Sequence, residues 1–290
     1  MNFRLFSGLT LLLVLSFSTG CVSRLFYHPS PILRETPEVL GIDYEDVYFP
    51  SEDGTRLHGW FLPARTQPGW ATVVQLHGNA HNVSSHYRYV TWLVAEGVNV
   101  LCFDYRGYGL SEGKPERAGI LKDSRAAIRY AASRPDVDPD RIVLLGQSLG
   151  GANAVVAAAT LQDVTVRGVI VDSAFYSYRS IVADKIKLIP VLAWFRAPLS
   201  WILIGNRYSP GPVIGSLAPM PLLFFHSIED PVVPVSHTHR LYEAAGEPKQ
   251  LYLIDQRGHI DALGSQRDRM RPRVLAFIRS AVESDQGSDN

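Results

Sequence analysis

The chain has 290 residues, of which 46% are hydrophobic and 10% aromatic. This composition is typical of a folded protein with a hydrophobic core and excludes a disordered chain. Lysine plus arginine and aspartate plus glutamate number 28 each, so the sequence offers no basic field for nucleic acid and no nucleic-acid partner is expected.

The first element in chain order is an export segment. Residues 1–20 join a positively charged start, "MNFR", to an apolar run that ends in small residues, which predicts a signal peptide. Cys21 follows "STG", an arrangement that resembles the lipobox of bacterial lipoproteins. That resemblance implies a lipid on Cys21 as the mature amino terminus, a membrane anchor and a location in the cell envelope. Ordinary secretion and an uncleaved anchor are the alternatives.

Residues 21–41 are expected to form a linker or arm, and a regular pattern begins near residue 42. The segments 42–49 and 55–62 flank the turn "SEDG" and predict an antiparallel hairpin. Apolar strands are expected at 71–77 and 98–105, with a helix at 84–97 between them.

Strands and helices then continue to alternate. Helices are expected at 118–134 and 151–162, and strands at 141–146 and 166–173. An apolar, proline-spotted insertion at about 175–212 interrupts the alternation, which resumes at 221–227 and closes with a helix at 271–283. Continuous apolar strands alternating with helices predict one α/β domain over 42–283, with a mostly parallel sheet covered on both faces. The polar tail 284–290 is expected to be disordered.

The motif G-x-S-x-G occurs as "GQSLG", with Ser148 at its centre. The motif by itself is weak, but here the strand "RIVLL" precedes it and the helix "GANAVVAAA" follows it, which is the context that confirms a nucleophile elbow. Small residues on both sides make room for a sharp turn that exposes the serine hydroxyl at the carboxyl edge of the sheet. Ser148 is therefore the candidate nucleophile.

A serine nucleophile requires a base and an acid that orients the base, in the chain order serine, acid, histidine on this kind of fold. Asp230 follows the apolar strand "PLLFFHS", and His259 follows the strand "QLYLID". Glu229 and Asp255 are the substitutes for the acid. His237 and His239 are expected to face solvent on a helix, and no metal site is expected from them.

The loop "QLHGNAHN" follows the third strand, where such folds place an oxyanion loop. The backbone N–H groups of Asn79 and Leu149 are the predicted donors to an oxyanion. Tyr105 and Arg106, in the loop after the next strand, are expected to brace this loop. His77 is expected to be structural, and no cofactor is required.

These segments together resemble the α/β-hydrolase superfamily over about residues 44–282. The resemblance is carried by "FYHPSP", "DGTRLHGWFLP", "QLHGNAHN", "VLCFDYRGYGLSEG", "GQSLGG", "HSIEDPVVP" and "RGHID", and within the superfamily it is to the Bem46-type and related ABHD-type serine hydrolases. It implies an eight-stranded sheet, a short cap insertion after the sixth strand, and hydrolysis of a carboxylic ester or thioester on a small-molecule or lipid-linked acyl substrate. Ser227 stands where the superfamily commonly has glycine.

The expected activity is thus a monomeric serine hydrolase that works through an acyl-enzyme on Ser148, with Asp230 and His259. Two alternatives remain at this point: a serine peptidase or acyltransferase on the same triad, and a membrane-tethered binding protein without activity. The insertion is either a lid that accepts an acyl chain or contacts a lipid surface, or a short helical excursion packed on the domain.

Overall fold

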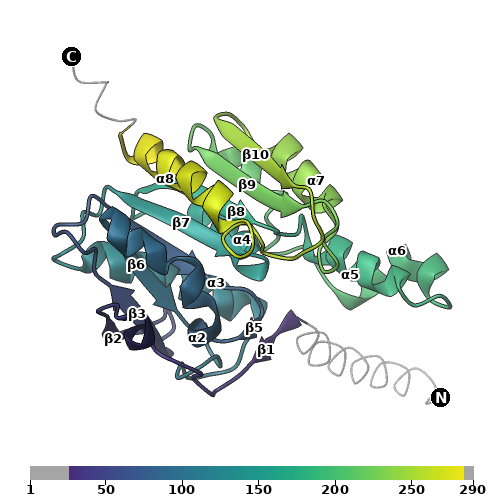
Figure 1. Ribbon diagram of the computed structural model, residues 1–290. Coiled ribbons are helices and arrows are strands. Elements are labelled where there is room, and N and C mark those ends of the chain that lie inside the picture. Colours follow the sequence, from purple (N-terminus) through teal and green to yellow (C-terminus); the bar gives the residue numbers. More distant parts are fainter. Residues whose placement is uncertain (1–25, 284–290) are drawn as a thin grey trace.

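The computed structural model describes residues 26–283 of the chain (Figure 1). The predicted signal peptide 1–20, the predicted lipidation site Cys21 and the predicted tail 284–290 all lie outside the described residues. Among residues 26–283, none of the helices is both long enough and apolar enough to span a lipid bilayer.

An eight-stranded sheet forms the centre of the molecule, in the spatial order β10-β9-β8-β7-β4-β6-β3-β2. Its strands are β2 (Glu45–Pro50), β3 (Arg56–Leu62), β4 (Ala71–Leu76), β6 (Val98–Phe103), β7 (Ile142–Gln147), β8 (Val166–Asp172), β9 (Leu222–Ser227) and β10 (Lys249–Ile254). The pairs β2–β3 and β3–β6 are antiparallel, and every other neighbouring pair is parallel. The structure confirms the predicted α/β-hydrolase fold with a mostly parallel eight-stranded sheet.

Helices cover both faces of this sheet, as Figure 1 shows. They are α2 (Val83–His86), α3 (Arg117–Ser133), α4 (Leu149–Thr160), α5 (Tyr178–Lys187), α6 (Arg196–Leu203), α7 (Ser236–Ala244) and α8 (Arg267–Glu283), with short 3₁₀ helices η1 (Pro37–Leu40), η2 (Tyr87–Tyr89), η3 (Thr91–Glu96), η4 (Ala193–Phe195) and η5 (Ile214–Leu217). Because successive strand residues point to opposite faces, Leu144 joins the core under α3 and α4, whereas Val143 joins the core under α8.

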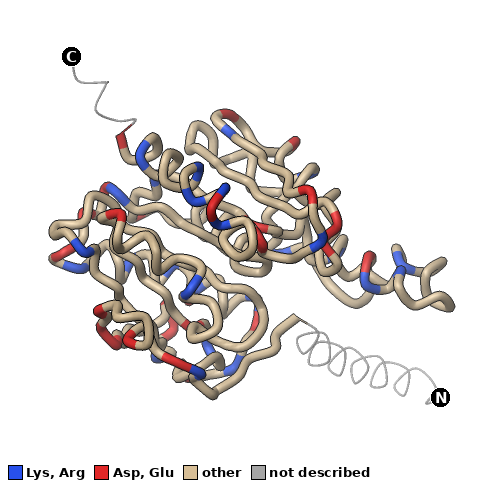
Figure 2. Tube along the Cα trace, viewed as in Figure 1, with Lys and Arg blue, Asp and Glu red and all other residues tan. Residues whose placement is uncertain are grey.

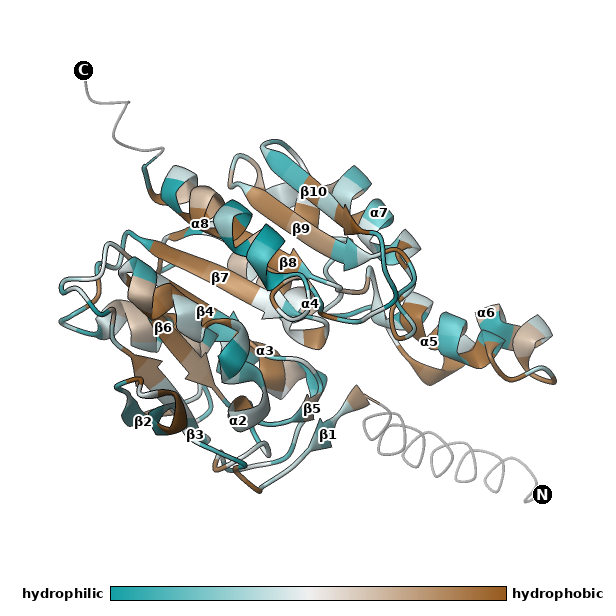
Figure 3. Cartoon of the chain, in the orientation of Figure 1, coloured by the Kyte–Doolittle hydropathy of each residue, from teal (hydrophilic) through white to brown (hydrophobic). Residues whose placement is uncertain are grey.

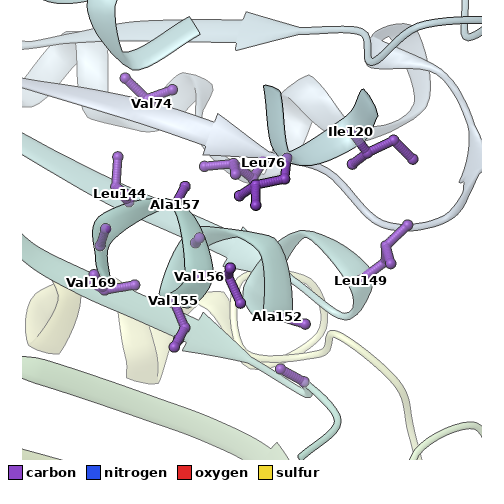
Figure 4. Packing of buried hydrophobic residues seen from close by; sticks show 14 of the residues in the cluster. Val74, Leu76, Ile120, Leu144, Leu149, Ala152, Val155, Val156, Ala157 and Val169 are labelled. Carbon is purple, nitrogen blue, oxygen red and sulfur yellow. The ribbon is translucent and has the colours of Figure 1, made fainter. Parts of the chain in front are cut away.

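Helix α4 follows the candidate nucleophile Ser148 directly and is packed on the sheet by a buried hydrophobic cluster. Leu76 and Leu144 of the sheet belong to the same buried cluster as Ala152 and Val156 of α4, and Figure 4 shows part of this cluster. All six residues of β7 are buried, and Figure 3 shows the apolar character of the first part of this strand. The end of β7 and the start of α4 are therefore held rigidly by apolar packing on both sides.

Two expectations differ from the structure. The predicted helix 84–97 is broken into α2, η2 and η3, because its run "YRYVTW" is rich in aromatic and β-branched residues that weaken an α-helix. The predicted arm at 21–41 is not a free linker where it is described. Strand β1 (His28–Pro29) pairs in parallel with β5 (Ala80–His81), which fastens the arm to the loop after β4.

Candidate active site

Ser148 lies at the junction between β7 and α4, in the nucleophile elbow that the sequence predicts. Its backbone has φ +55° and ψ −115°, a conformation that a residue with a side chain rarely adopts. The main-chain N–H of Ser148 donates a hydrogen bond to the carbonyl of Asp172 at the end of β8, with an N–O distance of 2.7 Å. This hydrogen bond and the strained backbone conformation together hold the Cβ atom of Ser148, which carries the hydroxyl, at the carboxyl edge of the sheet.

The two glycines of the elbow are required by contact distances. A Cβ atom at Gly150 would lie 1.9 Å from the carbonyl oxygen of Leu76, and a Cβ atom at Gly146 would lie 2.4 Å from the carbonyl oxygen of Gly150. Neither backbone atom can move without disturbing β4 or the elbow itself. The glycines thus allow β7, α4 and the loop after β4 to approach each other around Ser148.

Asp230 and His259 form a direct pair. Asp230 follows β9 and His259 follows β10, and the Nδ1 atom of His259 lies 2.7 Å from the Oδ2 atom of Asp230. The other oxygen, Oδ1, accepts hydrogen bonds from the N–H groups of Val232 at 2.7 Å and Val233 at 2.9 Å. An ionised carboxylate only accepts, so Nδ1 must carry the proton and Nε2 is left as the basic nitrogen.

The electrostatics of Asp230 suit this role. Its side chain is completely buried, and burial by itself raises the pKa of a carboxyl group. The hydrogen bond and positive charge of His259, together with the N–H groups of Val232 and Val233, outweigh burial and hold the pKa of Asp230 below its ordinary value. Asp230 is therefore an ionised partner that stabilises a charged His259.

The residues between the elbow and the histidine loop link the two. The Ser173 hydroxyl, directly after β8, accepts a hydrogen bond from the N–H of Ile260 at 3.3 Å and donates one to Oδ1 of Asp172 at 2.9 Å. Asp172 is fully buried; burial raises its pKa to about 7, and the charge of His259 partly opposes this rise. One strand end thus connects to the loop of His259 through its side chains and to Ser148 through its main chain.

The loop after β4 lies beside Ser148, as expected of an oxyanion loop. A Cβ atom at Gly78 would lie 3.9 Å from the Cβ of Ser148. The carbonyl of Asn79 accepts hydrogen bonds from the N–H of His28 and the hydroxyl of Tyr108, both at 2.9 Å. These contacts fix the peptide of Asn79 in place. Asn79 and Leu149 both line the same cavity as Ser148.

Two expectations about neighbouring residues need correction. Tyr105 does contact the oxyanion loop, because its hydroxyl donates to the carbonyl of His77 at 3.1 Å. Arg106 does not, and instead forms a buried ion pair with Asp123 at 2.8 Å. His237 does not face solvent: it is buried, and its Nε2 lies 2.8 Å from Oδ2 of Asp184. The sequence places His237 on a helix but does not show that α5 covers that helix face.

Comparison with known proteins identifies the family. A model of the hydrolase family described as serine aminopeptidase, S33, matches residues 67–214, a range that includes the oxyanion loop and the elbow. The chain belongs to this α/β-hydrolase family.

Two relatives share sequence with this α/β hydrolase, and a solved structure of another protein shares its fold. The uncharacterized protein YfhR of Escherichia coli K12 is 40% identical over 285 residues, covering 94% of each chain. The α/β hydrolase domain-containing protein WAV2 of Arabidopsis thaliana is 34% identical over 72% of this chain and 69% of its own length. The structure of the esterase Pf2001 from Pyrococcus furiosus superposes with a TM-score of 0.72 at 24% identity, over 88% of this chain and 97% of that one.

A cavity of about 340 Å³ opens beside Ser148 in this hydrolase. Its walls are almost wholly apolar, and Lys185 is the charged residue among those that line it. Helix α5 contributes Ile181, Val182 and Ile186, which lie on one face of the helix at successive spacings of one and four residues, and Ile189 lines the cavity just beyond the end of α5. The cavity suits an uncharged hydrocarbon chain placed next to the Ser148 side chain.

Sequence reasoning missed Asp172 and Ser173. The signal was available, because Asp172 ends an apolar strand and Ser173 follows it, and the carboxyl end of this strand lies between those of β7 and β9. For a metal, residues 26–283 contain no group of three or more histidine, cysteine, aspartate or glutamate side chains placed to hold one. The side chains assembled here are those of acid, base and nucleophile chemistry.

Proposed function

We propose that this α/β hydrolase is a serine hydrolase of the Bem46 type that cleaves carboxylic esters or thioesters through an acyl-enzyme. The proposal depends above all on the 2.7 Å contact between His259 and buried Asp230. This pair lies at the sheet edge that also carries the strained Ser148 beside an apolar cavity. The likeness of the fold to that of an esterase from Pyrococcus furiosus is consistent with the proposal.

The proposed reaction has two halves. Nε2 of His259 takes the proton from Ser148, and the serine oxygen attacks the acyl carbonyl carbon, whose oxygen becomes an oxyanion held by the N–H groups of Asn79 and Leu149. When the tetrahedral species collapses, the leaving alcohol or thiol takes the proton from Nε2. Water, deprotonated by the same nitrogen, then attacks the acyl-enzyme. The bond between the acyl carbon and the Ser148 oxygen breaks, the serine oxygen takes the proton back from Nε2, and the carboxylic acid is released. Asp230 stabilises the imidazolium in both halves.

The cavity favours an acyl chain over a peptide amino terminus. An aminopeptidase must hold a cationic amine, for which a carboxylate is the natural partner. The residues that line this cavity offer Lys185 and no carboxylate, so an amine placed there meets a like charge and apolar walls. The description of the family as serine aminopeptidase therefore does not carry over as the preferred activity.

Labelling with a fluorophosphonate probe tests the nucleophile. The wild-type protein should be labelled on Ser148, and Ser148→Ala should remain folded but lose labelling and at least about 10³-fold of its turnover of p-nitrophenyl esters. Ser133→Ala is the matched control, because Ser133 is exposed at the end of α3 and bonds only locally. Labelling that persists in Ser148→Ala would overturn the assignment, and an unlabelled wild type would indicate an inactive binding protein.

The substrate class is tested separately with a panel of acyl p-nitrophenyl esters, acyl thioesters and aminoacyl p-nitroanilides. We expect turnover of esters or thioesters with chains of several carbons and little turnover of aminoacyl amides. Preferred cleavage of the aminoacyl amides would replace this proposal with a peptidase.

We further propose that residues 1–20 are removed and that lipidated Cys21 anchors the enzyme to a membrane of the cell envelope. The support is the sequence: a charged start, an apolar run and small residues before the cysteine. Mass spectrometry of the purified mature amino terminus is the test. A diacylated Cys21 is expected, and an unmodified Cys21 or an uncleaved leader would overturn the lipoprotein proposal.

A further inference from the structure

An apolar ridge projects from the insertion between β8 and β9. Of the fifteen large apolar side chains that are exposed in the described part of the chain, eight fall within the fifteen residues 188–202. We define the ridge by these eight: Leu188, Ile189, Val191, Leu192, Trp194, Phe195, Trp201 and Ile202. In Figure 1, α5 and α6 extend away from the body of the molecule, and Figure 3 shows apolar colouring along this projection.

The exposure of the ridge is unusual for a stable protein surface. Trp194 is 92% exposed and Val191 is 80% exposed. Scattered single apolar residues are normal on a surface, but a contiguous cluster of this kind marks an interaction site. Tryptophan is also enriched where proteins meet the interface of a lipid bilayer, and phenylalanine and leucine accompany it on the apolar faces of interfacial helices.

The charges around the ridge identify the partner. Between residues 177 and 209 the basic side chains are Arg179, Lys185, Lys187, Arg196 and Arg207, against the single acid Asp184. Asp184 is already bonded to the buried His237. Figure 2 shows basic residues on both α5 and α6. An apolar ridge with a basic border is complementary to a bilayer that carries anionic lipid.

The same charges argue against a second copy of the chain. In a two-fold dimer the ridge would meet itself, and each basic residue would approach the basic residues of its partner. Arg179 lies over the ring of Trp201, with the guanidinium carbon 3.5 Å from the ring centre, so a basic group borders the apolar contact directly. Self-association would bury like charges, whereas a bilayer surface with anionic headgroups would neutralise them.

The amino-terminal end of the described chain lies at the base of the ridge. The ring of Phe26 contacts the ring of Tyr178, the first residue of α5, with a centroid distance of 5.3 Å. Phe26 is five positions after Cys21, and five residues of extended chain span at most about 17 Å. An anchor at Cys21 therefore holds this end of the molecule close to the bilayer.

We propose that the ridge inserts into the interfacial region of a bilayer containing anionic lipid. Helix α5, which leads directly into the ridge, lines the cavity beside Ser148 through Ile181, Val182 and Ile186. A docked ridge therefore places the cavity next to the lipid. If the proposed function also holds, a lipid acyl chain can enter the cavity without crossing bulk water.

Fluorescence quenching by brominated phosphatidylcholine tests the insertion. The full-length protein is reconstituted into vesicles with and without phosphatidylglycerol, and tryptophan emission is compared between brominated and ordinary lipid. We expect at least a third of the emission to be quenched in the anionic vesicles. The double variant Trp194→Phe, Trp201→Phe keeps the ridge apolar but removes its fluorophores, and should lose most of the quenching. Trp70→Phe is the control, because the ring of Trp70 lies against Glu96 and Arg279, and this variant should not lower the quenched fraction.

The charge requirement is tested by Lys187→Gln with Arg196→Gln, which should lower quenching at least two-fold in anionic vesicles. The control is Arg65→Gln, at an exposed position before β4. Undiminished quenching in the tryptophan double variant would overturn the proposal. A wild-type protein that is not quenched in anionic vesicles and forms a stable dimer in analytical ultracentrifugation would identify a second copy as the occupant instead. Ser148→Ala should be quenched like the wild type, so failure of the proposed hydrolase activity leaves this result unaffected.

Discussion

The main-chain nitrogen of Ile260 donates a hydrogen bond to the Ser173 hydroxyl at 3.3 Å, across 87 residues of sequence. Both residues have positive φ angles, +59° at Ser173 and +55° at Ile260, a region that costs a β-branched residue most. The bond fastens the residue after His259 to the end of β8. The position of the proposed base therefore depends on a serine that takes no part in the proposed chemistry.

This bond predicts the effect of Ser173→Ala. Loss of one hydrogen bond of about 1 kcal/mol should lower kcat about five-fold while KM changes little, because the histidine loop loses an anchor and the cavity is untouched. Ser173→Gly removes the same hydroxyl but tolerates the positive φ. Equal kcat losses in both variants would assign the effect to the hydroxyl, and an unchanged kcat in both would show that the bond does not position His259.

Asp172 predicts a dependence of stability on pH. Burial raises its pKa from 3.8 to about 7 in the folded protein. Below pH 3.8 both folded and unfolded states hold the proton; as pH rises towards 7 the unfolded state releases it first, and the folded state is progressively destabilised. Asp172→Asn removes this titration. The free energy of unfolding of Asp172→Asn should therefore rise relative to that of the wild type between pH 4 and 7. The difference should reach roughly 2 to 4 kcal/mol at pH 8.

Urea denaturation of both proteins at several pH values between 4 and 8 measures this advantage. The exposed Asp140 supplies the control, since Asp140→Asn should show a difference that is small and nearly constant with pH. A constant difference for Asp172→Asn as well would mean that Asp172 ionises in the folded protein as readily as in water.

The three proposed catalytic residues could be predicted from the sequence because each is marked locally. Ser148 lies between a strand and a helix pattern with glycines on both sides, and Asp230 and His259 each follow an apolar strand. The carboxyl ends of the parallel neighbours β9 and β10 share one edge, so the topology places Asp230 and His259 near each other. The structure adds their 2.7 Å contact.

Other parts of the site depend on contacts that no local pattern records. His237 is buried because Asp184, 53 residues away on α5, covers and bonds it. Arg106 turns away from the oxyanion loop because Asp123 and Asp53 offer it two carboxylates on the opposite side. The apolar periodicity of the insertion indicates helices, but it does not distinguish the face that lines the cavity from the face left exposed.

The pair of Asp230 and His259 predicts a large effect for Asp230→Asn. An amide can donate to Nδ1, which would favour the wrong tautomer and move the proton to Nε2. Turnover of a p-nitrophenyl ester should fall by about 10³ to 10⁴-fold, with the fold retained in circular dichroism. The neighbouring exposed acids serve as controls: Glu229→Gln and Asp255→Asn should keep activity within a few-fold of the wild type. A larger loss in either of these would identify a different acid.

The contact distances of the elbow predict the outcome of Gly150→Ala. The new Cβ would lie 1.9 Å from the carbonyl oxygen of Leu76, a backbone atom in β4 that cannot move without breaking the sheet. We expect a loss of stability of at least about 3 kcal/mol or failure to fold. Gly205→Ala, where no atom lies within 4 Å of the added carbon, should unfold thermally within about 2 °C of the wild type. A stable, active Gly150→Ala protein would contradict the close packing described here.

The cavity wall predicts how acyl-chain preference can be changed. Val182 is buried and lines the cavity from α5, so Val182→Phe should fill space that a long acyl chain needs and leave the region next to Ser148 free. We expect kcat/KM for a p-nitrophenyl octanoate to fall at least ten-fold while that for the acetate changes less than two-fold, because only the longer chain loses apolar contacts. Val39→Phe, at an exposed position on η1, should alter neither rate. An equal loss for both esters would place the acyl chain outside this cavity, and the ratio of the two rates is the measurement that decides.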